Sequence, residues 1–88
     1  MVSKTVTVIN EQGMHMRPAG MISKAAKAHP DTEIILKVDG NEIKAKAVMQ
    51  IMAAGITKGK EVELVVSGDN EQAVLDEFVK MFEEGFGE

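Results

Sequence analysis

Two hydrophobic periods alternate along the chain, and their order limits the fold more than any other feature. Four segments alternate apolar with polar residues, as strands with one buried face do: 5–8, 34–38, 42–45 and 61–67. Two others, about 16–28 and the stretch after Gly68-Asp69-Asn70, carry apolar residues at helical spacing, and the almost wholly apolar segment 47–54 is expected to be a short helix. The order is therefore βαββαβα. Because one-faced strands need a cover, we expect a two-layer α/β (α+β) sandwich whose helices lie on the sheet.

Short turn signals mark where these elements end. Asp39-Gly40 separates two strand segments, and this dipeptide favours a two-residue hairpin whose turn residues both have positive φ. Gly55 follows the short middle helix and is expected to be its left-handed cap. Asp69 and Gln72 have the spacing of a capping box at the start of the last helix. The hairpin makes the sheet at least partly antiparallel.

Length and composition exclude several kinds of protein. Eighty-eight residues suffice for one domain, so we expect a single domain over 1–88. The absence of cysteine excludes disulfides and thiolate metal sites, and two histidines support a metal site only weakly. We therefore expect neither a metal nor a cofactor. No apolar run approaches the ~20 residues of a membrane helix, and the N-terminus lacks a secretory signal pattern, so we expect a cytoplasmic protein.

Charge is unevenly distributed over a chain whose formal net charge is −4. Acidic residues are absent from residue 12 to residue 30, a stretch that contains Arg17, Lys24 and Lys27. Such a local basic face suits a small anion or an acidic protein partner. A nucleic-acid binder would need a strongly basic stripe and stacking aromatics, whereas this chain has three Phe and neither Trp nor Tyr. We therefore expect no nucleic-acid partner.

His15 lies where a strand-like segment gives way to a helical one. On a helical wheel, Ala19, Ile22 and Ala26 fall together and are expected to face the core. His15 then stands at the top of the opposite, partly basic face, which carries Met16, Arg17, Gly20, Lys24 and Lys27.

The start of this helix suits an anion. The backbone N–H groups of Met16 and Arg17 fall in the first turn, where no intrahelical carbonyl is available to them. The helix dipole favours an anion there by roughly 0.3–1 kcal/mol, and the Arg17 guanidinium can donate charge-assisted hydrogen bonds to phosphate oxygens. Pro18 has no N–H, which is no loss in the first turn. The segment therefore suits a phosphoryl group held on His15.

Other chemistry fits the segment less well. Neither Ser nor Cys flanks His15 and no carboxylate lies in the acid-free stretch, so a hydrolytic triad is not expected. The segment can accept, hold and pass on a group, as a relay protein does without substrate turnover of its own. Two alternatives stay open. His15 could be only an exposed or capping histidine, and the chain could be a small βαβ-type binding module, for which His15→Ala would leave function intact.

The segment Gly13-Met14-His15-Met16-Arg17-Pro18-Ala19 resembles the active-site signature of the HPr family, histidine-containing phosphocarriers of the bacterial phosphoenolpyruvate:sugar phosphotransferase system. The similarity extends over the whole chain through its length, element order, hairpin and residues 46–59. It implies an open-faced β-sandwich with a four-stranded antiparallel sheet, covered on one face by three helices. It also implies a monomer in which enzyme I phosphorylates Nδ1 of His15, Arg17 stabilises the phosphohistidine, and enzyme IIA domains of sugar transporters take the phosphoryl group.

The resemblance also places partner docking on the first helix and the short second helix. The residues expected there are Met16, Gly20, Met21, Lys24, Lys27, Lys46, Ala47, Val48, Met49, Gln50, Met52 and Ala53. Gln50 is the only polar residue within 47–54, so this helix either exposes an apolar patch or is buried on both sides. A ring of cationic side chains around an exposed patch would steer acidic partners. The residues expected in this ring are Arg17, Lys24, Lys27 and Lys46.

One position departs from the family pattern. Many HPr proteins carry a regulatory serine directly after the lysine numbered Lys46 here, whereas this chain has Ala47. Because alanine has no hydroxyl, the resemblance implies no regulatory phosphorylation at this position. A regulatory paralogue that serves a nitrogen-linked or other signalling relay, with the same His15 chemistry, therefore stays open.

Overall fold

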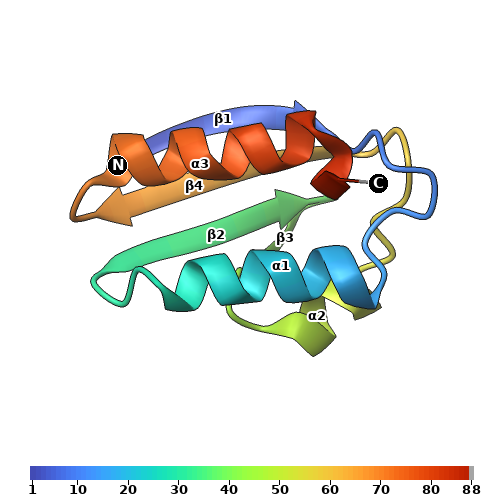
Figure 1. Cartoon of the computed structure of the whole chain (residues 1–88), viewed down its shortest axis with the longest axis horizontal. Coiled ribbons are helices and arrows are strands. Elements are labelled where there is room, and N and C mark those ends of the chain that lie inside the picture. Colours follow the sequence, from blue (N-terminus) through green and yellow to red (C-terminus); the bar gives the residue numbers. More distant parts are fainter. Residues whose placement is uncertain (88) are drawn as a thin grey trace.

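The computed structural model describes residues 1–87 (Figure 1). Its elements follow the predicted βαββαβα order, with a short 3₁₀ helix, η1, after the last α-helix. They are β1 (Val2–Thr7), α1 (Met16–Lys27), β2 (Thr32–Val38), β3 (Asn41–Lys44), α2 (Val48–Ala53), β4 (Glu61–Gly68), α3 (Glu71–Glu83) and η1 (Gly85–Gly87). The predicted order is confirmed, and element ends differ from the predicted ones by a few residues.

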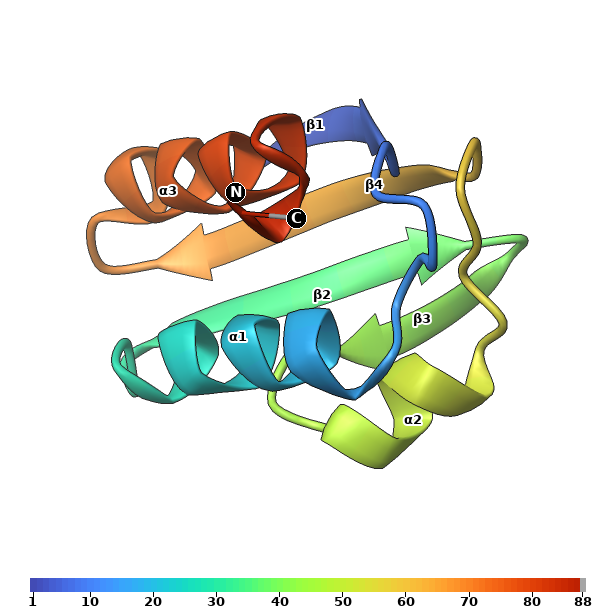
Figure 2. The same cartoon turned by 45° about the vertical axis from the view of Figure 1, so that its right-hand side comes forward.

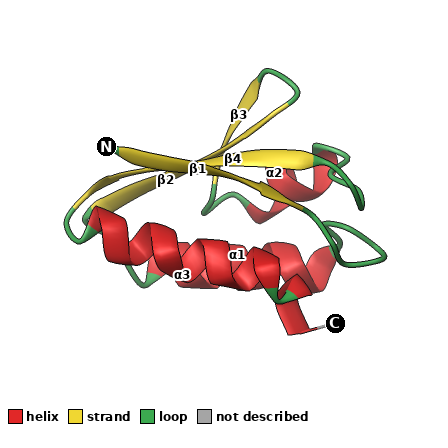
Figure 3. Ribbon diagram, turned by 90° about the horizontal axis from the view of Figure 1, so that it is seen from above, coloured by secondary structure: helices red, strands yellow, loops and turns green. Residues whose placement is uncertain are grey.

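The strands form one four-stranded sheet in the order β1-β4-β2-β3, and every neighbouring pair is antiparallel. The helices lie on one face of this sheet and leave the other face open (Figure 3). α1 covers the β2 side, α3 covers the β1 and β4 side, and α2 lies next to α1 (Figure 2). The predicted open-faced, two-layer sandwich is therefore confirmed.

The predicted hairpin joins β2 to β3. Asp39 has φ +51° and Gly40 has φ +82°, and Val38 pairs with Asn41 across the turn. Both turn residues thus adopt the left-handed conformation that a type I′ turn requires. Gly55, with φ +68°, follows the end of α2 in the left-handed conformation that was predicted for it.

The core lies between the sheet and the helices. The strands bury the alternating residues that the sequence indicated, and α1 buries Ala19, Ile22 and Ala26, each at most 1% exposed. From α3, the side chains of Val74, Leu75, Phe78 and Phe82 are buried, and Met81 is half-buried. Burial of each large apolar side chain favours folding by about 1.5–3 kcal/mol, so this packing holds α1 and α3 against the sheet.

The predicted capping box at α3 is wrong. The N-cap is Asn70, in a left-handed conformation with φ +55°, and its side chain makes no capping hydrogen bond. The Glu71 carboxylate instead accepts a hydrogen bond of 3.2 Å from the backbone N–H of Gly68. Gln72 donates to Asp76 one turn later, at 3.0 Å. The side chain that accepts a backbone N–H at this helix start is therefore Glu71, one residue before the predicted Gln72.

Strand β1 begins earlier than the alternating pattern predicted. Its residues from Val2 onward pair with β4, and Val2 lies opposite Val66. Val8 lies after the end of the strand, although its backbone N–H donates to the Lys60 carbonyl at 2.9 Å. Pairing with a neighbouring strand, not local alternation, sets this boundary. Within residues 1–87, no helix is both long and apolar enough to cross a membrane.

Candidate functional site

His15 is the N-cap of α1. Its backbone is extended, with φ −86° and ψ −169°, and its carbonyl accepts the first helical bond from Ala19 at 3.1 Å. The N–H groups of Met16 and Arg17 therefore point out of the helix start, where they can donate to an anion. Pro18 is buried in the first turn. The His15 ring is half-buried, with its Nε2 atom buried.

An open hollow of about 500 Å³ brings His15 and Arg17 together, as predicted. Its remaining lining comes from the loop before α1: Ile9, Asn10, Glu11 and Gln12. The sequence had indicated no carboxylate beside His15, but Glu11 lines the same hollow. A 2.7 Å hydrogen bond from Lys58 Nζ, with the charge attraction of that ammonium, holds the pKa of the Glu11 carboxyl below its ordinary value. Glu11 is therefore an ionised partner of Lys58 at the rim of the hollow.

The loop that carries His15 is held against the segment between α2 and β4. The backbone N–H of Met14 donates to the Ile56 carbonyl at 2.8 Å. Gly13 has φ +66°, and a Cβ atom at this residue would lie 2.4 Å from the Ile56 carbonyl oxygen. Only glycine combines this left-handed backbone with such a close approach. Gly13 therefore sets the path by which the chain reaches His15.

Asn10 is a site residue that the sequence analysis missed. Its side chain is 4% exposed, and its Nδ2 donates to the Gly13 carbonyl at 2.6 Å. The Gly13 N–H in turn donates to the Asn10 carbonyl at 3.1 Å. A polar residue in a segment that breaks a strand indicates an exposed turn, so nothing in the local pattern signals this buried amide.

The end of the described chain also borders the site. Phe86 is 1% exposed, and its ring packs edge-on against Phe82 with the ring centroids 4.9 Å apart. A Cβ atom at Gly87 would lie 3.8 Å from Nη2 of Arg17. Burial of Phe86 thus anchors η1 beside the guanidinium. The sequence pattern did not indicate this contact.

The residues expected in partner docking lie on α1, on α2 and in the segment before α2. None of the twelve is fully buried. Met16 and Met49 are 70% and 75% exposed, whereas Ile51 carries the buried side of α2. The alternative that α2 is buried on both sides is therefore wrong, and the helix exposes apolar side chains. Ser23 of α1 donates to the Lys46 carbonyl at 2.9 Å, which ties the segment before α2 to α1.

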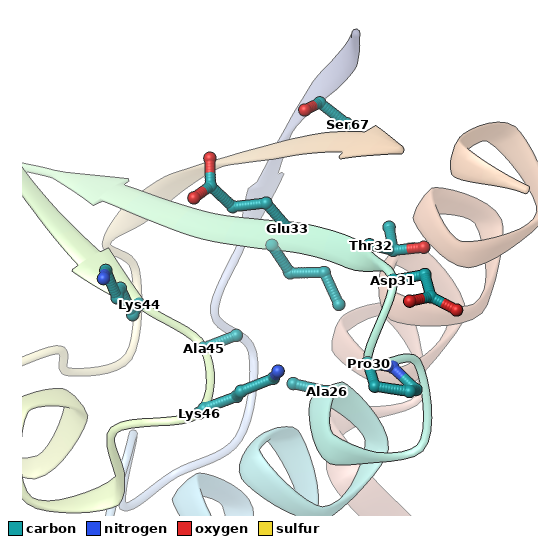
Figure 4. A pocket seen from close by; sticks show the side chains of 10 residues that line it. Ala26, Pro30, Asp31, Thr32, Glu33, Lys44, Ala45, Lys46 and Ser67 are labelled. Carbon is teal, nitrogen blue, oxygen red and sulfur yellow. The ribbon is translucent and has the colours of Figure 1, made fainter. Parts of the chain in front are cut away.

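A separate cavity of about 400 Å³ lies between the end of α1, β2 and residues 44–46 (Figure 4). Its charged lining residues are Asp31, Glu33, Lys44 and Lys46, and the Lys46 side chain reaches towards Ala26 across it (Figure 4). Neither His15 nor Arg17 contributes to this cavity. Residues 1–87 contain no group of three or more His, Cys, Asp or Glu side chains that could hold a metal ion.

Comparison with known proteins identifies the family of the chain. The family model described as PTS HPr component phosphorylation site matches residues 2–84. The phosphocarrier protein HPr of Treponema pallidum is 42% identical over 88 residues, which are 100% of this chain and 99% of that protein. The phosphocarrier protein NPr of Escherichia coli K12 is 32% identical, over 99% of this chain and 97% of that protein.

A solved structure agrees with the fold. The crystal structure of HPr-C-His from Thermoanaerobacter tengcongensis is 32% identical and has a TM-score of 0.93, over 100% of this chain and 98% of that one. Proteins of this kind carry a phosphoryl group between partners and are not catalytic enzymes, as expected for a relay protein. With fold and relatives in agreement, the chain belongs to the HPr family of phosphocarrier proteins of the phosphotransferase system.

Proposed function

We propose that His15 accepts a phosphoryl group from phospho-enzyme I on Nδ1 and passes it to enzyme IIA domains for sugar uptake. The observation that carries this proposal is the placement of His15 at the N-cap of α1, in one hollow with Arg17. Burial of the Nε2 atom supports Nδ1 as the acceptor, because a donor protein cannot reach a buried nitrogen unless the ring moves. A bond forms between phosphorus and Nδ1 while the bond between phosphorus and its donor breaks.

The helix start then stabilises the transferred group. The N–H groups of Met16 and Arg17 donate to phosphoryl oxygens, and the Arg17 guanidinium supplies charge-assisted hydrogen bonds. Positioning and electrostatic stabilisation dominate phosphoryl transfer, and these donors supply both at His15. Because the next acceptor must also reach His15, the group is held at the protein surface and not enclosed.

The surface around His15 is suited to transient partners. Exposed Met16 and Met49 offer flexible apolar contacts, and Lys24 and Lys27 lie on the exposed face of α1. The rest of this docking surface comprises Gly20, Met21, Lys46, Ala47, Val48, Gln50, Met52 and Ala53. Cationic side chains around an apolar patch accelerate encounter with acidic partners.

The protein acts as a cytoplasmic monomer with one domain over 1–88.

A second candidate is a nitrogen-linked regulatory relay with the same His15 chemistry. The presence of Ala47 in place of a serine motivates this candidate, and the chain is 32% identical to an NPr, compared with 42% to an HPr. Ala47 is the N-cap of α2 and makes no capping hydrogen bond through its side chain. Parallel transfer assays with a sugar-type and a nitrogen-type enzyme I separate the candidates, because the cognate donor transfers faster.

The proposal is tested by incubating the chain with phosphoenolpyruvate and enzyme I and measuring the mass of the intact product. We expect one added phosphoryl group, which disappears in His15→Ala and persists in His29→Ala. These variants are matched because the chain contains only these two histidines. A wild-type protein that gains no mass with either type of enzyme I contradicts both candidates and favours the binding module. Labelling that persists in His15→Ala contradicts the assignment of the site.

A further inference from the structure

The buried amide of Asn10 adds little to stability, although it lines the hollow that contains His15. It lies in the loop before α1 and lines the hollow together with His15 and Arg17. We propose that Asn10 is a positioning residue for phosphoryl transfer, which fixes the Gly13 carbonyl and thereby the backbone of His15. This inference rests on the proposed function of His15.

The hydrogen bonds around Gly13 carry the inference. The Gly13 carbonyl oxygen accepts from two donors, Asn10 Nδ2 at 2.6 Å and the backbone N–H of His15 at 3.1 Å. The Gly13 N–H donates back to the Asn10 carbonyl at 3.1 Å. The side-chain amide is therefore bonded to the same oxygen that holds the N–H of His15. A shift of that oxygen moves the N-cap of α1 and with it the imidazole.

Stability alone does not account for an amide at this position. The Oδ1 atom of Asn10 is buried and has no hydrogen-bond partner within residues 1–87. A buried acceptor without a partner costs about 1–3 kcal/mol, whereas the bond from Nδ2 contributes about 0.5–1.5 kcal/mol. Alanine would remove the unpaired oxygen and would leave the Gly13 carbonyl bonded to His15. The amide therefore contributes little net stability, and its effect lies in the geometry of the loop.

The position of the His15 ring determines the rate of phosphoryl transfer. The nucleophilic nitrogen must lie in line with the donor's phosphorus, and misplacement by about 1 Å can slow such a step by as much as about 10²-fold. Asn10 is 4% exposed, so it lies beneath the surface that a partner protein meets. Its loss should therefore slow the transfer step and leave the affinity for the donor protein unchanged.

The test compares Asn10→Ala with Thr32→Val. Thr32 is a matched control because its Oγ1 also donates to a backbone carbonyl at 2.6 Å, that of Asp69, and because it is 5% exposed and outside the hollow. Both variants and the wild type are mixed with phospho-enzyme I at increasing concentration. Single-turnover kinetics then separate the maximal transfer rate from the half-saturating concentration. Thermal unfolding and amide NMR spectra are recorded on the same samples.

We expect Asn10→Ala to lower the maximal rate about ten-fold or more with an unchanged half-saturating concentration. The amide resonances of His15, Met16 and Arg17 should shift, whereas Thr32→Val should change neither rate nor these resonances. A maximal rate in Asn10→Ala within two-fold of wild type, or an equal loss in Thr32→Val, overturns the inference.

A second measurement keeps the inference testable if Asn10→Ala does not fold. In the wild type, the Nδ2 protons of Asn10 should exchange slowly with solvent, and fast exchange overturns the hydrogen bond to Gly13. Failure of the proposed function gives a different result, because the wild-type protein then accepts no label from phospho-enzyme I. If the wild type accepts no label, the NMR comparison still tests the positioning role: His15 amide resonances that are the same in Asn10→Ala and in the wild type overturn it.

Discussion

Substitution of Gly13 by alanine should be far more damaging than the same change at another left-handed glycine. Gly13 and Gly40 have φ of +66° and +82°. An added Cβ atom at Gly40 meets nothing within 4 Å, whereas at Gly13 it would lie 2.4 Å from the Ile56 carbonyl oxygen and 2.8 Å from the Thr57 Cα atom. Both variants place a Cβ atom on a left-handed backbone, but only Gly13→Ala adds a clash. The difference between their free energies of unfolding therefore measures the cost of the contact with Ile56 and Thr57.

The magnitudes follow from these contacts. The left-handed conformation costs a residue with a Cβ atom about 1–2 kcal/mol, which is the expected loss for Gly40→Ala. In Gly13→Ala the Ile56 carbonyl must also move away, which breaks its 2.8 Å bond from the buried Met14 and leaves that N–H unpaired. That adds about 1–3 kcal/mol, for a total of about 2–5 kcal/mol.

Urea unfolding gives both free energies, and thermal unfolding checks them at about 4–8 °C per kcal/mol for a domain of this size. Gly13→Ala should also accept the phosphoryl group more slowly, because the displaced loop carries His15. Equal free energies of unfolding for Gly13→Ala and Gly40→Ala would refute the argument that contact with Ile56 fixes this loop.

Three further predictions concern the surface and the site. Gly20→Ala should raise the free energy of unfolding by about 0.5–1 kcal/mol, because the position is helical and an added Cβ atom meets nothing within 4 Å; urea unfolding checks this, and a decrease contradicts it. Arg17→Lys should shorten the lifetime of the phosphohistidine despite the unchanged charge, because an ammonium cannot donate bidentately; ³¹P NMR decay curves measure it, and equal lifetimes contradict it. Because the Lys58 hydrogen bond lowers the pKa of Glu11, this pair stabilises the fold above the ordinary pKa of a glutamate, and its contribution disappears as the pH falls through the lowered value. Carboxyl ¹³C titration should show the Glu11 pKa rising in Lys58→Met, and an unchanged value contradicts the pairing.

The fold was predictable where short-range sequence patterns determine the structure. Asp39-Gly40 fixed a hairpin, and the apolar spacing of α1 identified Ala19, Ile22 and Ala26 as its buried side. What failed depended on neighbours distant in sequence. The start of β1 follows from its pairing with β4, and the Asp69–Gln72 spacing had a competitor in Glu71, which reaches the Gly68 N–H.

The site was predictable where helix geometry alone decides it. Once the helix is predicted to begin near Met16, His15 and Arg17 necessarily lie at its start. In the structure both line one hollow. Asn10 and Glu11 could not be assigned in this way, because they reach the hollow through a loop whose path depends on Gly13 and Ile56. The positions of such loop residues depend on tertiary contacts, which the local spacing of apolar residues does not predict.

The position of the phosphoryl group on the chain tests the central claim most directly. The protein, labelled with ¹⁵N in its histidine rings, is phosphorylated with phosphoenolpyruvate and enzyme I and observed by ³¹P and ¹⁵N NMR. The account predicts one phosphorus signal, coupled to Nδ1 of His15. A phosphoryl group on His29, on Nε2 of His15 or on an oxygen atom would contradict it.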